Sequence, residues 1–348
     1  MSDLVGLVRA VQANYYRVRL REAVNGIEEL LCVRRARLKK MGQQVCVGDW
    51  VVVTHPDWPG QRGAIAEILP RRNQLPRPAI ANVDQIFLLF ALADPPAEVH
   101  QISRFLLTAE GLNVQIHVVF TKADLVLLPV QQQWRDRLHQ WGYACDVISL
   151  TVGNDWQCLQ PRLAHKITVV CGPSGVGKSS LIRHLTPREE IRIGAVSDHW
   201  HRGRHTTRHV ELFPLLQGGW IADTPGFNQP ELPPDPQQLA AAFPEIRQRL
   251  SKDRCLFDNC CHDQEPGCCV RGDWERYPLY LEYLHELEAL TSPEPFLGNL
   301  PRVKVKSDSQ GQPRLEPLLD PKKYRRRSRR QQHQHLNPMA EEVLDSEL

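Results

Sequence analysis

The sequence contains no apolar run long enough to cross a membrane as a helix, which takes about 20 residues. Its longest candidate, IFLLFALA at 86–93, suits a buried strand instead. The N-terminal stretch MSDLVGLVRAVQ lacks the basic start and apolar block of a secretory signal. No internal repeat is visible either. We therefore expect a cytoplasmic protein without a membrane-spanning segment.

Neither polar residues nor charges of one sign dominate the composition. Apolar residues make up 42% and charged residues 24% of the 348 residues, which is typical of a globular chain with two or three domains. The net charge of +3 is unevenly spread, because residues 322–330 (KKYRRRSRR) hold seven cations and residues 341–347 hold four acids. Two interpretations of this end of the chain stay open: contact with RNA, or a solvated tail.

The first 78 residues consist of short β-rich runs separated by turn residues. Runs such as YYRVRL and DWVVVTH alternate with VGD and DWPGQRG, and no helix-length amphipathic run intervenes. About five short strands in this span predict a small barrel of the OB type over residues 1–78. Its cations either bind an oligonucleotide or only face solvent. They are Arg34, Arg35, Arg37, Lys39, Lys40, Arg71, Arg72 and Arg77.

Apolar strands alternate with helical stretches between residues 79 and 235. VDQIFLLFALA, VQIHVVF, ACDVISL and KITVVCG are strand-like, and HQISRFLLTAEGL and VQQQWRDRLHQWG are helix-like. This alternation predicts a doubly wound α/β domain with a mostly parallel sheet, whose ligand lies at the carboxyl ends of the strands.

Two further parts follow. Residues 236–298 contain helical patterns on both sides of a group of cysteines, and residues 299–348 form a charged tail for which we expect no regular structure.

The stretch CGPSGVGKSS at 171–180 contains a complete phosphate-binding motif. It follows the apolar strand ITVVC and precedes SLIRHL, which can form a helix, so the motif has the context it needs. Its glycines let backbone N–H groups turn toward phosphates, Lys178 neutralises the β- and γ-phosphates, and Ser179 offers a hydroxyl to Mg²⁺.

Two downstream stretches match the switch regions of GTPases. Asp223, in WIADTPGF, follows an apolar strand and can hold Mg²⁺, and Gly226 can donate its N–H to the γ-phosphate. The stretch GRHTTRH lies between the phosphate loop and WIADTPGF. Its threonines Thr206 and Thr207 can contact the γ-phosphate and Mg²⁺. We assign Mg²⁺ to Ser179, Thr207 and Asp223, with the choice between the two threonines open.

One residue that many GTPases use is missing. The position after Gly226 is Phe227, whereas many GTPases have a Gln there that orients the attacking water. A phenyl ring cannot bond water in this way. His205 is the best candidate to replace the Gln, because imidazole can donate to or accept from water near neutral pH.

The stretch VVFTKADL at 118–125 resembles a guanine-reading loop, although it precedes the phosphate loop. A carboxylate such as that of Asp124 accepts bonds from N1–H and the 2-amino group of guanine, and adenine offers neither. The Ser149-Leu150 pair after CDVI supplies a second guanine loop. All the parts of a GTPase are present in an altered order, and a sheet tolerates such a cut if the original ends lay close together. The domain is thus predicted to be circularly permuted.

The predicted site is therefore a site for GTP and GDP with bound Mg²⁺, in which Lys178 and His205 carry the catalysis. The residues assigned to nucleotide binding are Thr121, Lys122, Asp124, Ser149, Gly172, Pro173, Ser174, Gly175, Val176, Gly177, Lys178, Ser179, Ser180, Thr206, Thr207, Asp223 and Gly226.

Ten cysteines are present, and five of them lie within residues 255–269. In a cytosolic chain such clustering favours a metal over disulfides. Cys255, Cys260, His262 and Cys268 follow the pattern Cys-x4-Cys-x-His-x5-Cys, which can form a closed, structural zinc site. Cys261 and Cys269 lie beside these ligands and compete for the same role.

The chain resembles the RsgA/YjeQ family of circularly permuted, ribosome-dependent GTPases. The resemblance covers about residues 1–295 and rests on TKAD, GPSGVGKSS, GRHTTR, DTPGF and CLFDNCCHDQEPGC in that order. It implies a multi-domain α/β protein with an OB-type barrel, a permuted P-loop GTPase domain and a small helical zinc domain.

The resemblance also implies a partner and residue roles. It implies a late-stage assembly factor of the small (30S) ribosomal subunit that contacts 16S rRNA and hydrolyses GTP faster when bound there. It implies that His205 takes the place of the missing Gln, and that zinc binds the four residues already named. We expect the free chain to be monomeric.

Two positions depart from the family pattern. Thr121 stands where Asn is usual in the guanine loop, so we expect its shorter side chain to hold the neighbouring loops less firmly. Leu150 stands where a small residue is common.

Two other functions remain as alternatives: a nucleotide-gated RNA-binding module, and a P-loop kinase or ATPase acting on a small metabolite. Asp124 argues against the second, because that function requires tolerance of adenine.

Overall fold

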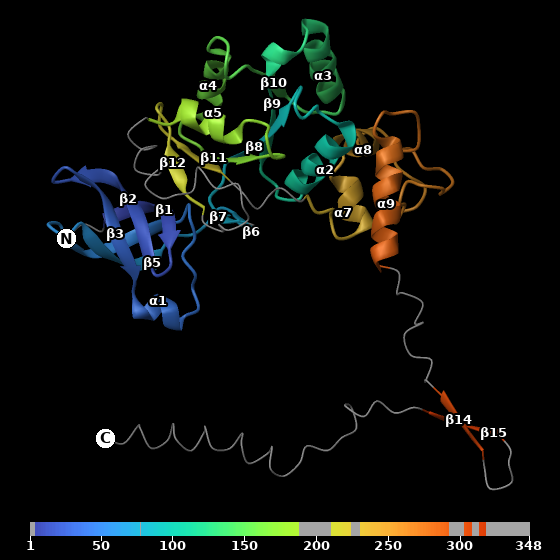
Figure 1. Ribbon diagram of the computed structural model, residues 1–348, viewed down its shortest axis with the longest axis horizontal. Coiled ribbons are helices and arrows are strands. Elements are labelled where there is room, and N and C mark those ends of the chain that lie inside the picture. Colours follow the sequence, from blue (N-terminus) through green and yellow to red (C-terminus); the bar gives the residue numbers. More distant parts are fainter. Residues whose placement is uncertain are drawn as a thin grey trace. The chain divides into compact units, whose positions relative to one another are not determined.

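The structure, a computed structural model, is shown in Figure 1. It describes residues 4–76, 78–187, 210–223, 230–291, 303–307 and 313–317. The chain divides into two compact units, Met1–Leu287 and Glu288–Leu348. Within the described residues, no helix combines the length and apolar character that crossing a membrane requires.

The N-terminal part is a closed barrel with the strand order β1-β2-β3-β5-β4, which confirms the predicted OB-type architecture. Its strands are β1 (Leu4–Gln12), β2 (Tyr15–Val24), β3 (Ile27–Arg34), β4 (Trp50–Asp57) and β5 (Arg62–Ile68). Alternating apolar residues such as Val8, Val18 and Leu30 fill the interior. The short helix α1 (Ala36–Lys40) follows β3, and a parallel pairing of β3 with β5 helps to close the barrel.

A six-stranded sheet forms the second part, in the order β10-β9-β8-β11-β13-β12. Its strands are β8 (Gln85–Ala91), β9 (Gln115–Thr121), β10 (Cys145–Val147), β11 (Ile167–Cys171), β12 (Leu212–Pro214) and β13 (Trp220–Asp223). All neighbours are parallel except β12 and β13. Every residue of β8 is buried, as the apolar run at 86–93 predicts for a central strand.

Helices connect these strands, as the alternating pattern predicts. They are α2 (Val99–Glu110), α3 (Leu128–Gln140), α4 (Gln160–Leu163) and α5 (Lys178–Leu185), with short 3-10 turns η1 (Ala123–Leu125) and η2 (Asp155–Leu159). Between the barrel and the sheet, β6 (Gln74–Pro76) pairs with β7 (Ala79–Ala81). The carboxyl ends of β8, β9, β10, β11 and β13 therefore meet along one edge of the sheet.

The barrel is attached to the sheet domain at the start of β12. Ala10 of β1 forms a bridge with Glu211, the residue before β12. The Glu211 carboxylate accepts bonds from Arg9 (3.2 Å) and Arg17 (3.3 Å), and both arginines also bond Glu29 within the barrel. Leu7 of the barrel and Leu212 of β12 belong to the same hydrophobic core. The barrel thus packs directly on the strand that begins shortly after the GRHTTRH stretch.

Three helices form the third part of the chain, and the last of them extends past the end of the first unit. They are α7 (Pro236–Ala241), whose N-terminus is capped by the Asp235 carboxylate, α8 (Pro244–Leu250) and α9 (Tyr277–Thr291). Their core includes Phe243, Tyr280 and Tyr283 together with Leu107 of α2. The buried Arg276 donates two bonds to the Glu245 carboxylate at 2.7 and 2.5 Å, and its guanidinium lies 4.7 Å from the ring centroid of Trp141. This arginine joins the cysteine-containing part to the end of α3.

A two-stranded hairpin occurs inside the predicted tail. Val303–Ser307 (β14) pairs antiparallel with Pro313–Pro317 (β15). The expectation of no regular structure over residues 299–348 does not hold for these ten residues. The alternation of valine and lysine in VKVK is the pattern that indicates such a strand.

Removing the Arg276 guanidinium leaves the buried Glu245 carboxylate without its partner. We expect Arg276→Ala to lower the free energy of unfolding by about 3–5 kcal/mol, measured by urea titration of tryptophan fluorescence. Arg247→Ala is the matched control, because its pair with Glu110 is half-exposed and should cost less than about 1 kcal/mol. Equal losses in the two variants would contradict the role assigned to Arg276.

Candidate nucleotide and metal sites

The phosphate loop connects β11 to α5 at the carboxyl edge of the sheet. Gly172 has a φ of +143°, and a Cβ atom there would lie 2.1 Å from the Leu89 carbonyl oxygen, so only glycine fits. Gly177 precedes α5 with a φ of +94°. The Lys178 Nζ atom donates to the carbonyl oxygens of Gly172 (2.8 Å) and Pro173 (2.7 Å). This lysine therefore lies across the loop, where a phosphate oxygen can replace the carbonyls.

Burial lowers the pKa of the Lys178 ammonium, and the Asp223 carboxylate acts in the opposite direction. Asp223 ends β13, where it pairs in register with Val170 of the neighbouring β11. Ser179 lies exposed in the first turn of α5. A hydroxyl and a carboxylate at this place are oxygen ligands of the kind that Mg²⁺ prefers. The described residues thus fit a Mg²⁺ ion beside the phosphates.

The guanine loop follows β9, and its carboxylate is held in place by two hydroxyls. Asp124 accepts bonds from Ser149 (2.6 Å) and Thr151 (3.1 Å), which follow β10. The bond from Ser149 is the main reason that the pKa of the Asp124 carboxyl lies below its usual value. The group is therefore ionised and exposed at the edge of the sheet, as an acceptor for guanine must be. The sequence analysis did not identify Thr151 as part of this loop.

Thr121 connects the guanine loop to the phosphate loop. Its buried hydroxyl donates to the Val176 carbonyl oxygen at 2.6 Å, and it lies 3.3 Å from the Phe90 carbonyl oxygen. The Leu150 side chain covers Gly177, so that a Cβ atom there would lie 3.3 Å from it. We expected the shorter side chain of Thr121 to hold its neighbours less firmly. The backbone of the phosphate loop comes close enough for the hydroxyl to reach it.

The loop after β8 contacts both the proposed guanine loop and the phosphate loop, which the sequence analysis missed. Lys122 has a left-handed backbone, with a φ of 57°, and its Nζ atom donates to the Asp94 carbonyl oxygen. The neighbouring Pro95 lies against Gly175 of the phosphate loop. An aspartate and a proline directly after a buried strand were a signal for a loop at the carboxyl edge.

Four of the predicted site residues are not placed. His205, Thr206, Thr207 and Gly226 lie outside the described residues. The described members of the predicted nucleotide site come from the ends of β9, β10, β11 and β13, and they meet at one edge of the sheet.

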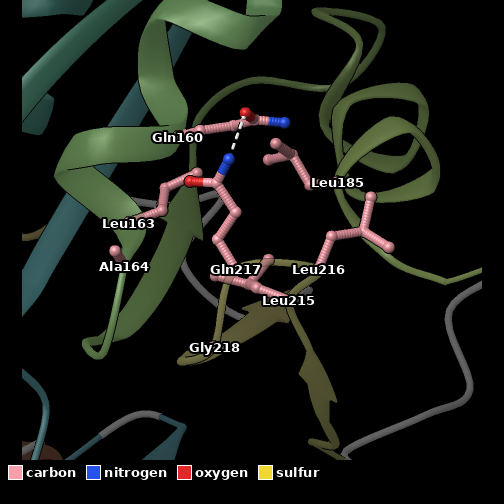
Figure 2. Close-up of a pocket in the computed structure, with 8 residues that line it drawn as sticks. All are labelled: Gln160, Leu163, Ala164, Leu185, Leu215, Leu216, Gln217 and Gly218. Atoms are coloured by element: carbon pink, nitrogen blue, oxygen red, sulfur yellow. Dashed lines mark hydrogen bonds between the residues drawn. The ribbon is translucent and has the colours of Figure 1, made fainter.

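A shallow hollow on the same domain lies away from this edge (Figure 2). Leu185, at the last turn of α5, and Leu215 line it, and Gln217 donates to Gln160 across it at 2.7 Å. The phosphate loop is at the first turn of α5. The hollow therefore lies at the opposite end of that helix and takes no part in the nucleotide site.

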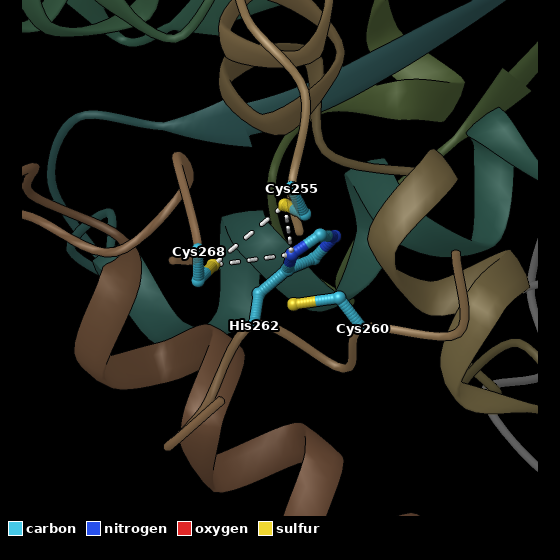
Figure 3. A group of neighbouring side chains, drawn as sticks. All are labelled: Cys255, Cys260, His262 and Cys268. Carbon is cyan, nitrogen blue, oxygen red and sulfur yellow. Dashed lines mark hydrogen bonds between the residues drawn. The ribbon is translucent and has the colours of Figure 1, made fainter. Parts of the chain in front are cut away.

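Cys255, Cys260, His262 and Cys268 converge on one point (Figure 3). Their four donor atoms all lie within 4.8 Å of one another, and Cys269 is not part of this group. The His262 Nδ1 atom lies 3.6 Å from the Cys255 sulfur and 3.5 Å from the Cys268 sulfur. Burial lowers the pKa of His262, which favours the neutral imidazole that a metal requires.

The polypeptide around this cluster is fixed by α9. Tyr277 donates its hydroxyl to the His262 carbonyl oxygen (2.9 Å), and Tyr280 donates to that of Cys261 (2.5 Å). The Glu265 carboxylate accepts from the backbone N–H groups of Cys261 and Asp263. Three thiols and one imidazole at these distances form a candidate metal site of the closed, structural kind.

The comparisons with known proteins agree with this arrangement. The family model described as RsgA GTPase matches residues 68–233. A protein named small ribosomal subunit biogenesis GTPase RsgA from Thermosynechococcus vestitus is 85% identical over 347 residues, covering 100% of both chains. A protein of the same name from Trichormus variabilis is 50% identical, and the match covers 98% of each chain.

Solved structures with the same fold give the same result. YjeQ from Thermotoga maritima superimposes with a TM-score of 0.68 at 28% identity, covering 82% of this chain and 99% of that one. A structure described as YloQ, a circularly permuted GTPase, gives 0.69 at 29% identity, covering 84% and 97%.

The fold and these relatives define a circularly permuted P-loop GTPase with an N-terminal barrel and a Cys/His cluster. The chain belongs to the RsgA family of GTPases, and it is therefore an enzyme that hydrolyses GTP.

The Thr121 hydroxyl should be needed for nucleotide affinity. Thr121→Val preserves the shape of the side chain and leaves the Val176 carbonyl oxygen unsatisfied, at a cost of about 1–3 kcal/mol. We expect GDP to bind about tenfold more weakly, measured by calorimetry. Thr121→Ser retains the hydroxyl and should stay within about threefold of the unaltered protein. If a folded Thr121→Val variant binds GDP with unchanged affinity, the Thr121 hydroxyl is not needed for nucleotide binding.

The Cys/His cluster should hold one metal ion per chain. Cys260→Ala removes one of its four donor atoms, so we expect loss of the ion in elemental analysis and earlier thermal unfolding. Cys158→Ala is the control, because this exposed cysteine lies outside the cluster. A full metal content in Cys260→Ala would exclude it as a ligand.

Proposed function

We propose that this chain is a Mg²⁺-dependent GTP hydrolase that acts in late maturation of the small ribosomal subunit. The observation that carries the proposal is the relative named small ribosomal subunit biogenesis GTPase RsgA, which is 85% identical over the whole chain. The bond from Ser149 to the Asp124 carboxylate and the bond from Lys178 to the Gly172 carbonyl oxygen support it, because they leave an acceptor for guanine and a cation for phosphates at one edge of the sheet.

The proposed chemistry is in-line attack of water on the γ-phosphate. Lys178 exchanges its bonds to the loop carbonyls for phosphate oxygens and neutralises the negative charge that develops on them. Ser179, Thr207 and Asp223 would hold a Mg²⁺ ion, which would supply further neutralisation of the phosphate charge. Thr206 and Gly226 complete the set of γ-phosphate contacts.

His205 orients the attacking water in this proposal. Phe227 stands where many GTPases have a Gln, and a phenyl ring cannot bond water. His205 does so when the small subunit is bound, which makes turnover dependent on the ribosome.

The barrel is the proposed contact surface for 16S rRNA. Arg35, Arg37, Lys39 and Lys40 are exposed on or beside α1. Arg71 has a different role, because it bonds the buried Asp49 carboxylate at 2.6 and 2.8 Å. The cations on and beside α1 would attract the phosphate backbone of the RNA independently of its sequence.

The proposed ribosomal partner implies a cytoplasmic location. We also propose that the free chain is monomeric.

The proposed domain organisation has four parts: 1–78 (OB barrel), 79–235 (permuted GTPase domain), 236–298 (zinc domain) and 299–348 (charged tail). Three hydrophobic cores, centred on the barrel, the sheet and the helices around the cysteines, support it, although Leu7 and Leu107 each contribute to the core of a neighbouring part. We propose zinc as the metal of the third part, because three thiolates and one imidazole favour that ion.

The role of His205 can be tested by turnover measurements. We expect His205→Ala to bind GTP with nearly unchanged affinity and to lose about a hundredfold in turnover stimulated by purified small subunits. His201→Ala, from the same stretch of chain, should retain the stimulation. Equal stimulation of His205→Ala and the unaltered protein would rule out the proposed role of His205.

The partner is tested by GTP hydrolysis with and without small ribosomal subunits, with ATP as the control nucleotide. Stimulation that is specific to GTP and to the small subunit supports the proposed function. GTP binding without any stimulation would leave a GTPase whose partner is different. If a substitution of Lys178 weakens RNA binding but leaves GTP turnover unchanged, the chain is better described as a nucleotide-gated RNA-binding module.

A further inference from the structure

A fifth thiol lies against the Cys/His cluster without belonging to it. The Cys269 sulfur is 3.5 Å from the Cys255 sulfur, which is closer than the 3.9 Å between Cys255 and Cys268. Yet the group whose donor atoms are mutually within 4.8 Å consists of the other four residues and excludes Cys269. Cys269 therefore touches one residue of the proposed zinc site without being one of its four donors.

The fold of the loop produces this contact. Gly267 has a φ of +71° and turns the chain immediately before Cys268 and Cys269. The Leu256 backbone N–H donates to the Gly267 carbonyl oxygen at 3.2 Å, which holds the residue after Cys255 against this turn. Cys255 and Cys269 are both partly exposed. A small oxidant can therefore reach this pair from solvent.

We propose that Cys255 and Cys269 form a peroxide-responsive pair whose oxidation releases the metal of the Cys/His cluster. The inference rests on the proposed zinc ligands. Its chemistry is that of a sensor cysteine beside a resolving cysteine. The two sulfurs must approach from 3.5 Å to the bond length of about 2.05 Å for the disulfide to form.

The reaction balances with hydrogen peroxide as the oxidant. The Cys255 thiolate attacks one peroxide oxygen, the O–O bond breaks, and a sulfenic acid and hydroxide form. The Cys269 sulfur then attacks the sulfenic sulfur, the S–O bond breaks, and the thiol proton leaves with the oxygen as water. One thiolate, one thiol and one peroxide give one disulfide, one hydroxide and one water, and the two sulfurs supply the two electrons.

Loss of Cys255 as a ligand leaves Cys260, His262 and Cys268, which cannot close a four-ligand site. The metal then dissociates more readily. Cys269 makes this change reversible, because a disulfide is reduced by thiols, whereas a sulfenic acid with no resolving thiol proceeds to the sulfinic acid, which thiols do not reduce.

The test compares the zinc-loaded full chain with Cys269→Ser after treatment with excess hydrogen peroxide. A chromogenic chelator measures zinc release, and dithiothreitol with added zinc then measures recovery. We expect most sites to recover in the unaltered protein and about a tenth or fewer in Cys269→Ser, where Cys255 becomes a sulfinic acid. Cys261→Ser, which changes the other cysteine next to a ligand, should recover like the unaltered protein.

Mass spectrometry identifies the bond. Trypsin cleaves after Arg254 and Arg271, so one peptide carries the five cysteines of residues 255–271. After the remaining thiols are alkylated, fragmentation should locate the disulfide between Cys255 and Cys269.

Three results would overturn the inference. A disulfide between Cys255 and Cys268 would make Cys269 a bystander, and equal recovery of Cys269→Ser and the unaltered protein would show that it does not protect Cys255. Failure of both Cys269→Ser and Cys269→Ala to bind zinc before oxidation would make Cys269 a ligand. Hydrolysis of GTP is a separate readout, so its failure is distinguishable from each of these results.

Discussion

The hydrogen bond from the Thr121 hydroxyl to the Val176 carbonyl oxygen is the contact on which the nucleotide site depends. It joins the proposed guanine loop to the phosphate loop, although Thr121 precedes Val176 by 55 residues. This is possible because β9 and β11 both flank β8 and end at the same edge of the sheet. The permutation changes the order of the loops along the chain and leaves their neighbours in space unchanged.

Much of the fold and of the candidate site could be predicted from short motifs, because the roles of their residues depend only on neighbours in the sequence. The glycines and Lys178 of the phosphate loop have roles set by backbone conformation and charge, and the buried strand at 86–93 follows from apolar character alone. The spacing of Cys255, Cys260, His262 and Cys268 likewise indicated a group that the structure brings within 4.8 Å. Motifs of this kind can be recognised in any order, which is why the altered order could be detected at all.

The remainder depends on contacts between distant segments, which local patterns do not contain. The bond from Thr151 to Asp124 and the position of Asp94 beside Lys122 arise only when three strand ends meet. The length of the Thr121 side chain alone did not reveal that its hydroxyl reaches the backbone of the phosphate loop. Arg71 was counted among cations that either bind an oligonucleotide or face solvent, although Asp49 binds it. The contact between Cys269 and Cys255 has the same origin, since adjacent residues in a turn face different partners.

Guanine selectivity by Asp124 is the central claim, because it requires the early loop and the late loop to form one site. The most direct measurement is the affinity of the unaltered protein for GDP and for ADP by equilibrium calorimetry, repeated with Asp124→Ala. The account predicts that GDP binds at least about a hundredfold more tightly than ADP, since two bonds to a charged acceptor are lost with adenine, and that Asp124→Ala removes most of this difference. Equal binding of GDP and ADP by the unaltered protein would contradict it.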